Sequence, residues 1–82
     1  MVKQTELREA AYEWIKELNQ NVIFSHDKIY RFLEENFALE CSQRGDAANE
    51  PRYKNDARWA VQDAKRDNLV TPTATRGQFR RV

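Results

Sequence analysis

The stretch that decides the fold is RYKNDARWAVQDAKRDNLVTPTATRGQFRRV, residues 52–82. Small apolar residues recur in it at helical spacing and predict a helix over residues 54–67. A β-prone pair, a Thr/Pro turn and the segment GQFRRV then predict a hairpin over residues 69–82, in which Phe79 points inward and its neighbours point out. The last third of the chain therefore reads as a helix followed by a β-hairpin.

The preceding residues predict two further helices and a loop. One apolar stripe at helical spacing runs through residues 4–19. A short β-prone run then leads to Ser25, a favourable N-cap residue, and to a second helix over residues 25–37. Small polar residues predict a loop over residues 41–52, and Leu39 is expected to turn back into the core. The order of elements is that of the winged helix-turn-helix, an α+β fold with three helices packed on a small hairpin wing.

Composition indicates one small domain. Eighty-two residues, of which 40% are hydrophobic, can form a core but leave little room for an enzyme pocket. The single Cys41 excludes an intramolecular disulfide and a multi-cysteine zinc site, and a lone thiol favours the cytoplasm. No apolar run reaches membrane-spanning length, and the N-terminal residues lack the apolar core of a signal peptide. We therefore expect a soluble, cytoplasmic domain that does not contact a membrane.

Positive charge gathers in the last third of the chain. Residues 52–82 carry eight Lys/Arg against three Asp, whereas residues 1–50 carry six Lys/Arg against ten Asp/Glu. On a helical wheel, Asp56, Asp63 and Asp67 fall on one flank of the predicted helix, and basic residues fall on the other. Since phosphate repels carboxylates, we expect these aspartates to face away from a nucleic acid or to pair with neighbours. This distribution favours a surface that binds a polyanionic partner. The alternative is a charged helix face that contacts only solvent.

Amide and guanidinium groups on the predicted helix suit the major groove of duplex DNA. Asn55, Arg58 and Gln62 are expected to approach base edges, and the hairpin is expected to lie on the adjacent backbone or minor groove. The complete predicted DNA-binding set is Arg52, Lys54, Asn55, Arg58, Gln62, Lys65, Arg66, Thr73, Thr75, Arg76, Arg80 and Arg81. Trp59 falls on the polar side of the wheel, where it either packs over the loop or the hairpin or stacks on an exposed base.

The same region resembles the N-terminal winged-helix domain of Mrr-type restriction proteins, or a closely related restriction-associated winged helix. The matching motif residues are Pro51-Arg52-Tyr53, Asn55, Arg58-Trp59-Ala60, Leu69, Arg76-Gly77 and Phe79. The resemblance covers about the last thirty residues, and the earlier helices agree in layout only. It implies binding of double-stranded DNA within a restriction or DNA-processing system, with a fused or associated nuclease domain for which this chain has no room. Three residues depart from the family pattern, namely Asp56, Ala64 and Asn68.

The sequence carries no recognisable catalytic motif. His26 is the only histidine, and predicted helix separates it from Cys41, which argues against a nucleophile–base pair. Gly-rich phosphate loops and metal-ligand clusters are absent from the sequence, so we expect no enzymatic activity, no metal, no cofactor and no small-molecule substrate. The rival interpretation is a winged helix used for dimerisation or partner docking, through the acidic face of the first helix or through Tyr12 and Tyr30.

Overall fold

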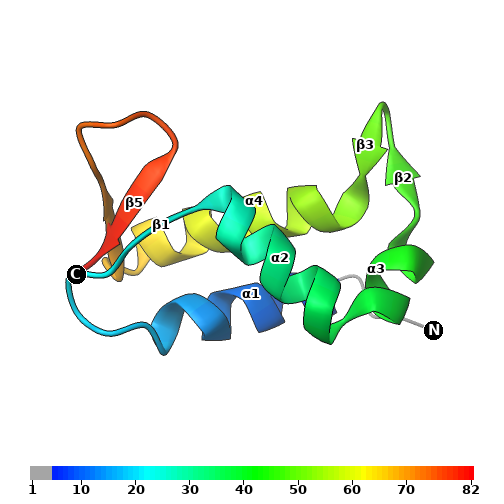
Figure 1. The fold of residues 1–82 in the computed structure, drawn as a ribbon, viewed down its shortest axis with the longest axis horizontal. Coiled ribbons are helices and arrows are strands. Elements are labelled where there is room, and N and C mark those ends of the chain that lie inside the picture. Colours follow the sequence, from blue (N-terminus) through cyan, green and yellow to red (C-terminus); the bar gives the residue numbers. More distant parts are fainter. Residues whose placement is uncertain (1–4) are drawn as a thin grey trace.

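The computed structural model describes residues 5–82, apart from the side chain of Ala47. These residues form four helices and a three-stranded antiparallel sheet, an α+β arrangement. The elements in chain order are α1 (Glu6–Lys16), β1 (Ile23–Ser25), α2 (His26–Asn36), α3 (Ala38–Arg44), β2 (Asp46–Ala47), β3 (Glu50–Pro51), α4 (Arg52–Arg66), β4 (Val70–Pro72) and β5 (Gln78–Arg81). Figure 1 shows α1 and α4 running along each other, α2 packed against both, and the sheet at the end of the molecule where the chain terminates.

The helices predicted over residues 4–19, 25–37 and 54–67 correspond to α1, α2 and α4. Each observed helix differs from its predicted bounds by no more than three residues at either end, and residue 4 lies outside the described residues. Ser25 takes the predicted N-cap position of α2 in an extended conformation, although its side chain makes no capping hydrogen bond. The amphipathic stripes therefore predicted these three helices correctly.

The sheet has the predicted hairpin as its main part. β5 lies between β1 and β4 and is antiparallel to both, and its register pairs Phe79 with Phe24 of β1. Phe79 is buried, whereas Gln78 and Arg80 are exposed, as the alternation predicted. Gly77 has a φ of 82°, which suits a residue without a Cβ in the turn that leads into β5. The hairpin thus gains β1 as a third strand and is fixed to the core by its central strand.

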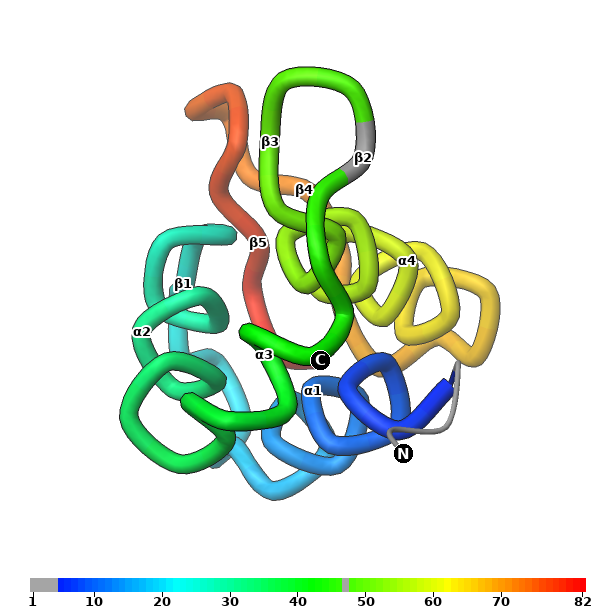
Figure 2. Tube along the Cα trace, turned by 90° about the vertical axis from the view of Figure 1, so that its right-hand side faces the viewer, coloured from blue at the N-terminus to red at the C-terminus, as the bar shows by residue number. Residues whose placement is uncertain are grey.

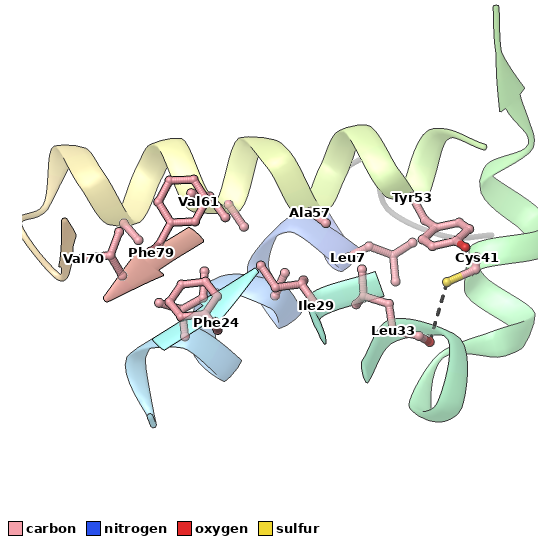
Figure 3. Packing of buried hydrophobic residues seen from close by; sticks show 14 residues of the cluster. Leu7, Phe24, Ile29, Leu33, Cys41, Tyr53, Ala57, Val61, Val70 and Phe79 are labelled. Atoms are coloured by element: carbon pink, nitrogen blue, oxygen red, sulfur yellow. Dashed lines mark hydrogen bonds between the residues drawn. The ribbon is translucent and has the colours of Figure 1, made fainter. Parts of the chain in front are cut away.

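A single apolar core joins the helices to the sheet (Figure 3). Phe24, Ile29 and Leu33 lie between α1 and α4 and are almost completely buried. The face that α4 turns toward them consists mainly of small residues, and Ala57 and Ala60 are fully buried there. Small side chains let α4 approach α1 closely, and burying these apolar groups is the main force that stabilises the domain.

The prediction of a loop over residues 41–52 is wrong. α3 continues to Arg44, β2 and β3 form a second small hairpin, and α4 already begins at Arg52. Leu39 is 67% exposed, so it does not turn back into the core, and Cys41 is the buried residue of α3 instead. A helix of seven residues has too few turns to show a clear apolar period, and its position depends on contacts with α2 and α4.

Asn68 ends α4 in the left-handed conformation, with a φ of 62°. The N–H of Leu69 then donates to the carbonyl of Ala64 at 2.8 Å, which closes the end of the helix and turns the chain into β4. Asparagine tolerates this conformation better than most residues.

Candidate nucleic-acid interface

The exposed face of α4 lies between two hairpins. β2–β3 stands at the N-terminal end of α4 and β4–β5 at its C-terminal end, and both project to the same side of the molecule (Figures 1 and 2). With 15 residues, α4 is about 22 Å long. Its inner face is buried against α1 and α2, so only one face is open to a ligand. The outward residues are Arg52, Asn55, Trp59, Gln62 and Arg66.

Two aspartates of α4 pair with α1 side chains, as predicted. Asp63 accepts hydrogen bonds from Nε and Nη2 of Arg8 at 2.6 and 2.7 Å, and Arg8 thereby lowers the pKa of Asp63. Asp67 accepts a hydrogen bond from the Tyr12 hydroxyl at 2.6 Å, which lowers the pKa of Asp67. Both carboxylates therefore stay charged at neutral pH and are compensated on the side of α4 that faces α1.

Asp56, a departure from the family motif, has a structural role. Its side chain is buried and accepts hydrogen bonds from Nε and Nη2 of Arg44 at 2.8 and 3.0 Å. Arg44 is the last residue of α3, so this bidentate pair fixes α3 and the start of β2 to α4. Asp56 thus does not present a carboxylate to a ligand on the outer face.

Arg58 is held within the protein more than the sequence suggests. Its guanidinium donates to the Tyr30 hydroxyl at 3.0 Å and also to the side chains of Glu50 and Asn55. These hydrogen bonds join α2, β3 and α4. Arg58 or Asn55 can contact a base only if its hydrogen bonds within the protein are replaced by hydrogen bonds to DNA. Glu50 carries no sequence signal for this role, because the segment around it reads as a loop.

The two lysines of α4 lie over aromatic rings of neighbouring elements. Lys54 Nζ is 5.2 Å from the centroid of the Tyr30 ring, and Lys65 Nζ is 6.0 Å from that of Phe79. Both lysines are half-exposed, so their stems pack on apolar surface while the ammonium groups stay near water. They form a basic flank of α4 toward α2 and β5, as the wheel predicted.

Three more of the predicted arginines have partners within the domain. Arg81 is half-buried and donates to the carbonyls of Lys16 at 3.0 Å and Val82 at 2.8 Å, so it ties β5 to the end of α1 in place of the predicted phosphate contact. Arg80 is exposed and donates to Asn21 Oδ1 at 2.9 Å. Arg66 is also exposed and pairs with Asp67 at 3.2 Å.

The remaining predicted residues are exposed or belong to the hairpin turn. Thr73 uses its hydroxyl to accept the Thr75 N–H at 3.2 Å, so it shapes the turn between β4 and β5. Thr75 is exposed beside it. Arg52, Gln62 and Arg76 are exposed, and their side chains make no hydrogen bond or ion pair to any other part of residues 5–82.

His26 supports the base of the hairpin. Its ring stacks on Tyr30 with centroids 6.3 Å apart and meets Phe79 of β5 edge-on at 5.2 Å. Burial, with a smaller contribution from Arg58, lowers the pKa of His26 below its ordinary value of 6.5. The folded protein therefore holds this imidazole neutral between α2 and the sheet.

Lowering the pH from about 7 to about 5 is expected to reduce the free energy of unfolding, because His26 takes up its proton more readily in the unfolded chain. His26→Phe keeps an aromatic ring between Tyr30 and Phe79 but cannot titrate. Urea unfolding at several pH values should show that the free energy of unfolding falls less in this variant than in the wild type between about pH 7 and about pH 5. An equal loss in both proteins would assign the pH dependence to other groups.

Cys41, the buried residue of α3, lies at one end of the core, near Tyr53 of α4 (Figure 3). Its thiol donates to the Leu33 carbonyl at 3.6 Å, and burial raises its pKa to about 11, so the reactive thiolate is scarce at neutral pH (Figure 3). Residues 5–82 contain no group of three side chains arranged to hold a metal ion. Within the same residues, no helix combines the length and the apolar character that crossing a bilayer requires.

Comparisons with known proteins leave the family open. Family models, curated proteins and solved structures were compared with the chain, and none of them matches. The resemblance to Mrr-type domains accordingly rests on the motif residues alone.

Proposed function

We propose that this domain is a winged-helix module that binds double-stranded DNA, with α4 in the major groove and the β4–β5 hairpin on the adjacent backbone. One observation carries the proposal: the acidic flank of α4 is paired inside the protein, while the outer face and the hairpin tip keep exposed polar and basic side chains. Arg52 and Gln62 on α4 and Arg76 on the hairpin represent this open set.

The arrangement of elements supports the same proposal. The hairpin follows α4 directly, and its second strand pairs with the strand between α1 and α2, which gives the order β1-β5-β4. This is the order expected of a winged helix. An α-helix with side chains is about 10–12 Å across and fits the major groove, which is about 12 Å wide.

The Mrr-like motif extends the proposal to a biological setting. We propose that the domain serves recognition in a cytoplasmic restriction or DNA-processing system, where a fused or associated nuclease domain cuts the DNA. The domain itself acts by binding and without catalysis, in keeping with a protonated, buried Cys41 and a His26 enclosed by aromatic rings.

The alternative is docking of a protein partner or dimerisation. The tyrosines first considered for such a surface are engaged within the domain, since Tyr12 bonds to Asp67 and Tyr30 bonds to Arg58. The exposed acidic face of α1 remains available for this alternative.

An anisotropy titration with a labelled random-sequence duplex tests the proposed function. We expect binding at about 50 mM salt that weakens steadily as salt is raised, because phosphate contacts release counterions from the duplex. Single-stranded DNA of the same composition and a duplex with modified bases serve as comparison ligands. If the folded protein binds none of the duplexes at low salt, the protein-docking alternative takes precedence.

A further inference from the structure

Trp59 is the most exposed aromatic side chain of residues 5–82. Its side chain lies in the middle of the outer face of α4 and is 57% exposed. Trp14, by contrast, packs against the core and meets the Phe24 ring at 5.7 Å. Whatever packing the rest of the side chain makes, more than half of Trp59 is therefore open to a ligand. Covering the exposed indole with an apolar group of a ligand removes apolar surface from water and therefore favours binding.

The indole is also held in place from one side. The Arg8 guanidinium carbon lies 5.3 Å from the centroid of the Trp59 ring. Arg8 is itself fixed by its two hydrogen bonds to Asp63, at 2.6 and 2.7 Å. A clamped cation over a ring restricts the ring's rotation, so less conformational entropy is lost when a ligand packs on the indole.

A hollow of about 200 Å³ adjoins the ring on the outer face. It is lined by Asn55, Arg58, Trp59 and Gln62. Two amides and a guanidinium are the groups that recognise base edges, and the indole is the apolar member of the set. The hollow therefore offers hydrogen bonds and one apolar surface side by side, on the face that the proposed function places in the major groove.

The major groove presents one apolar group, the C5-methyl group of a pyrimidine. We propose that Trp59 and the adjoining hollow form a reading site for a pyrimidine C5-methyl group of the bound duplex, an inference that rests on the proposed function. Thymine carries this methyl group in ordinary DNA, and 5-methylcytosine carries the same group in modified DNA. The Trp59 ring covers the methyl group, while the open Gln62 side chain bonds to the polar edge of a neighbouring base.

Random-sequence duplexes that differ only in this methyl group test the proposal. One pool contains thymine, a second contains uracil in its place, and a third contains uracil together with 5-methylcytosine in place of cytosine. Base pairing and the phosphate charge are the same in all three. We expect the wild type to bind the thymine pool about fourfold more tightly than the uracil pool, since each buried methyl group contributes about that factor. Recovery of affinity with the third pool would show that either source of the methyl group is read.

Two variants make the assignment specific. Trp59→Gln is expected to bind the thymine and uracil pools equally, and Trp59→Phe is expected to keep part of the preference. Leu39→Gln is the matched control, because Leu39 is 67% exposed on α3 and its loss removes a comparable apolar group away from α4. This control should keep the full preference for thymine.

Each remaining outcome overturns the proposal in a distinguishable way. Equal binding of the thymine and uracil pools by the wild type would overturn the methyl-reading site and leave duplex binding intact. A thymine preference that survives Trp59→Gln would place the methyl contact elsewhere on the domain. Absence of binding to every pool at low salt would overturn the reading site together with the proposed function.

Discussion

Replacing Arg52, Lys65 and Arg76 together by glutamine is expected to weaken duplex binding about a hundredfold at moderate salt while the domain stays folded. The three side chains come from the start of α4, the end of α4 and the hairpin turn, so they sample the whole proposed face. None of them makes a hydrogen bond or an ion pair within residues 5–82. Each lost phosphate contact should also reduce the slope of log affinity against log salt by about one unit.

The matched control is the triple change Lys16→Gln, Lys28→Gln and Arg31→Gln. These residues are exposed on α1 and α2, and their loss lowers the formal net charge of +1 by the same amount. Anisotropy titrations over a range of salt concentrations compare the two variants, and circular dichroism verifies the fold. Equal losses in both variants would mean that net charge, and not the face of α4, determines binding.

Arg58 is unsuitable for this experiment despite its place in the motif. Because it joins Tyr30, Glu50 and Asn55, its removal would disturb the β2–β3 hairpin as well as any contact with DNA. A binding defect in Arg58→Ala would therefore not separate recognition from local structure. The open residues give the sharper result.

Replacing Asp56 by alanine is expected to lower the free energy of unfolding by about 3 kcal/mol. The change leaves the half-buried Arg44 guanidinium without its two carboxylate bonds, and the 6% exposure of Asp56 means that water replaces them poorly. A loss of this size is a large share of the roughly 4–12 kcal/mol expected for a domain of 82 residues. Urea denaturation followed by circular dichroism measures it.

Two further variants distinguish the effect of breaking the buried Arg44–Asp56 pair from the effect of removing a charged residue in general. Asp67→Ala removes an exposed aspartate from the same helix and should change stability far less. Arg44→Leu combined with Asp56→Leu removes both charges and should recover much of the loss, because no buried charge is left unpaired. A cost for Asp56→Ala no greater than that for Asp67→Ala would contradict a structural role for the pair.

The amphipathic stripes determined much of this fold without reference to tertiary contacts. Leu7, Ala11 and Ile15 recur at helical spacing and are all fully buried in α1, and the alternation around Phe79 fixed which side of β5 faces the core. Both patterns are local, because the polarity of residues close together in the chain indicates which side of a helix or strand is buried. The same reasoning sorted the α4 aspartates onto the flank where they are now seen to be paired.

The region between α2 and α4 could not be predicted in this way. Its helix α3 is short, β2 and β3 have two residues each, and their composition of small polar residues is also typical of loops. What places them is the long-range pair between Arg44 and Asp56 and the contact of Glu50 with Arg58. Neither pair leaves a periodic signal in the sequence.

In the candidate site, too, some features follow from the local sequence and others depend on long-range contacts. By itself, the sequence determined which residues share the outer face of α4, because helical geometry fixes the direction of each side chain once the helix is known. Only the tertiary structure decided which of those side chains are open to a ligand: Arg81 and Arg58 are taken up by partners inside the domain, whereas Trp59, Gln62 and Arg76 are left exposed. The physical reason is that a hydrogen bond or an ion pair depends on where distant segments meet in space, while amphipathicity depends only on neighbours along the chain.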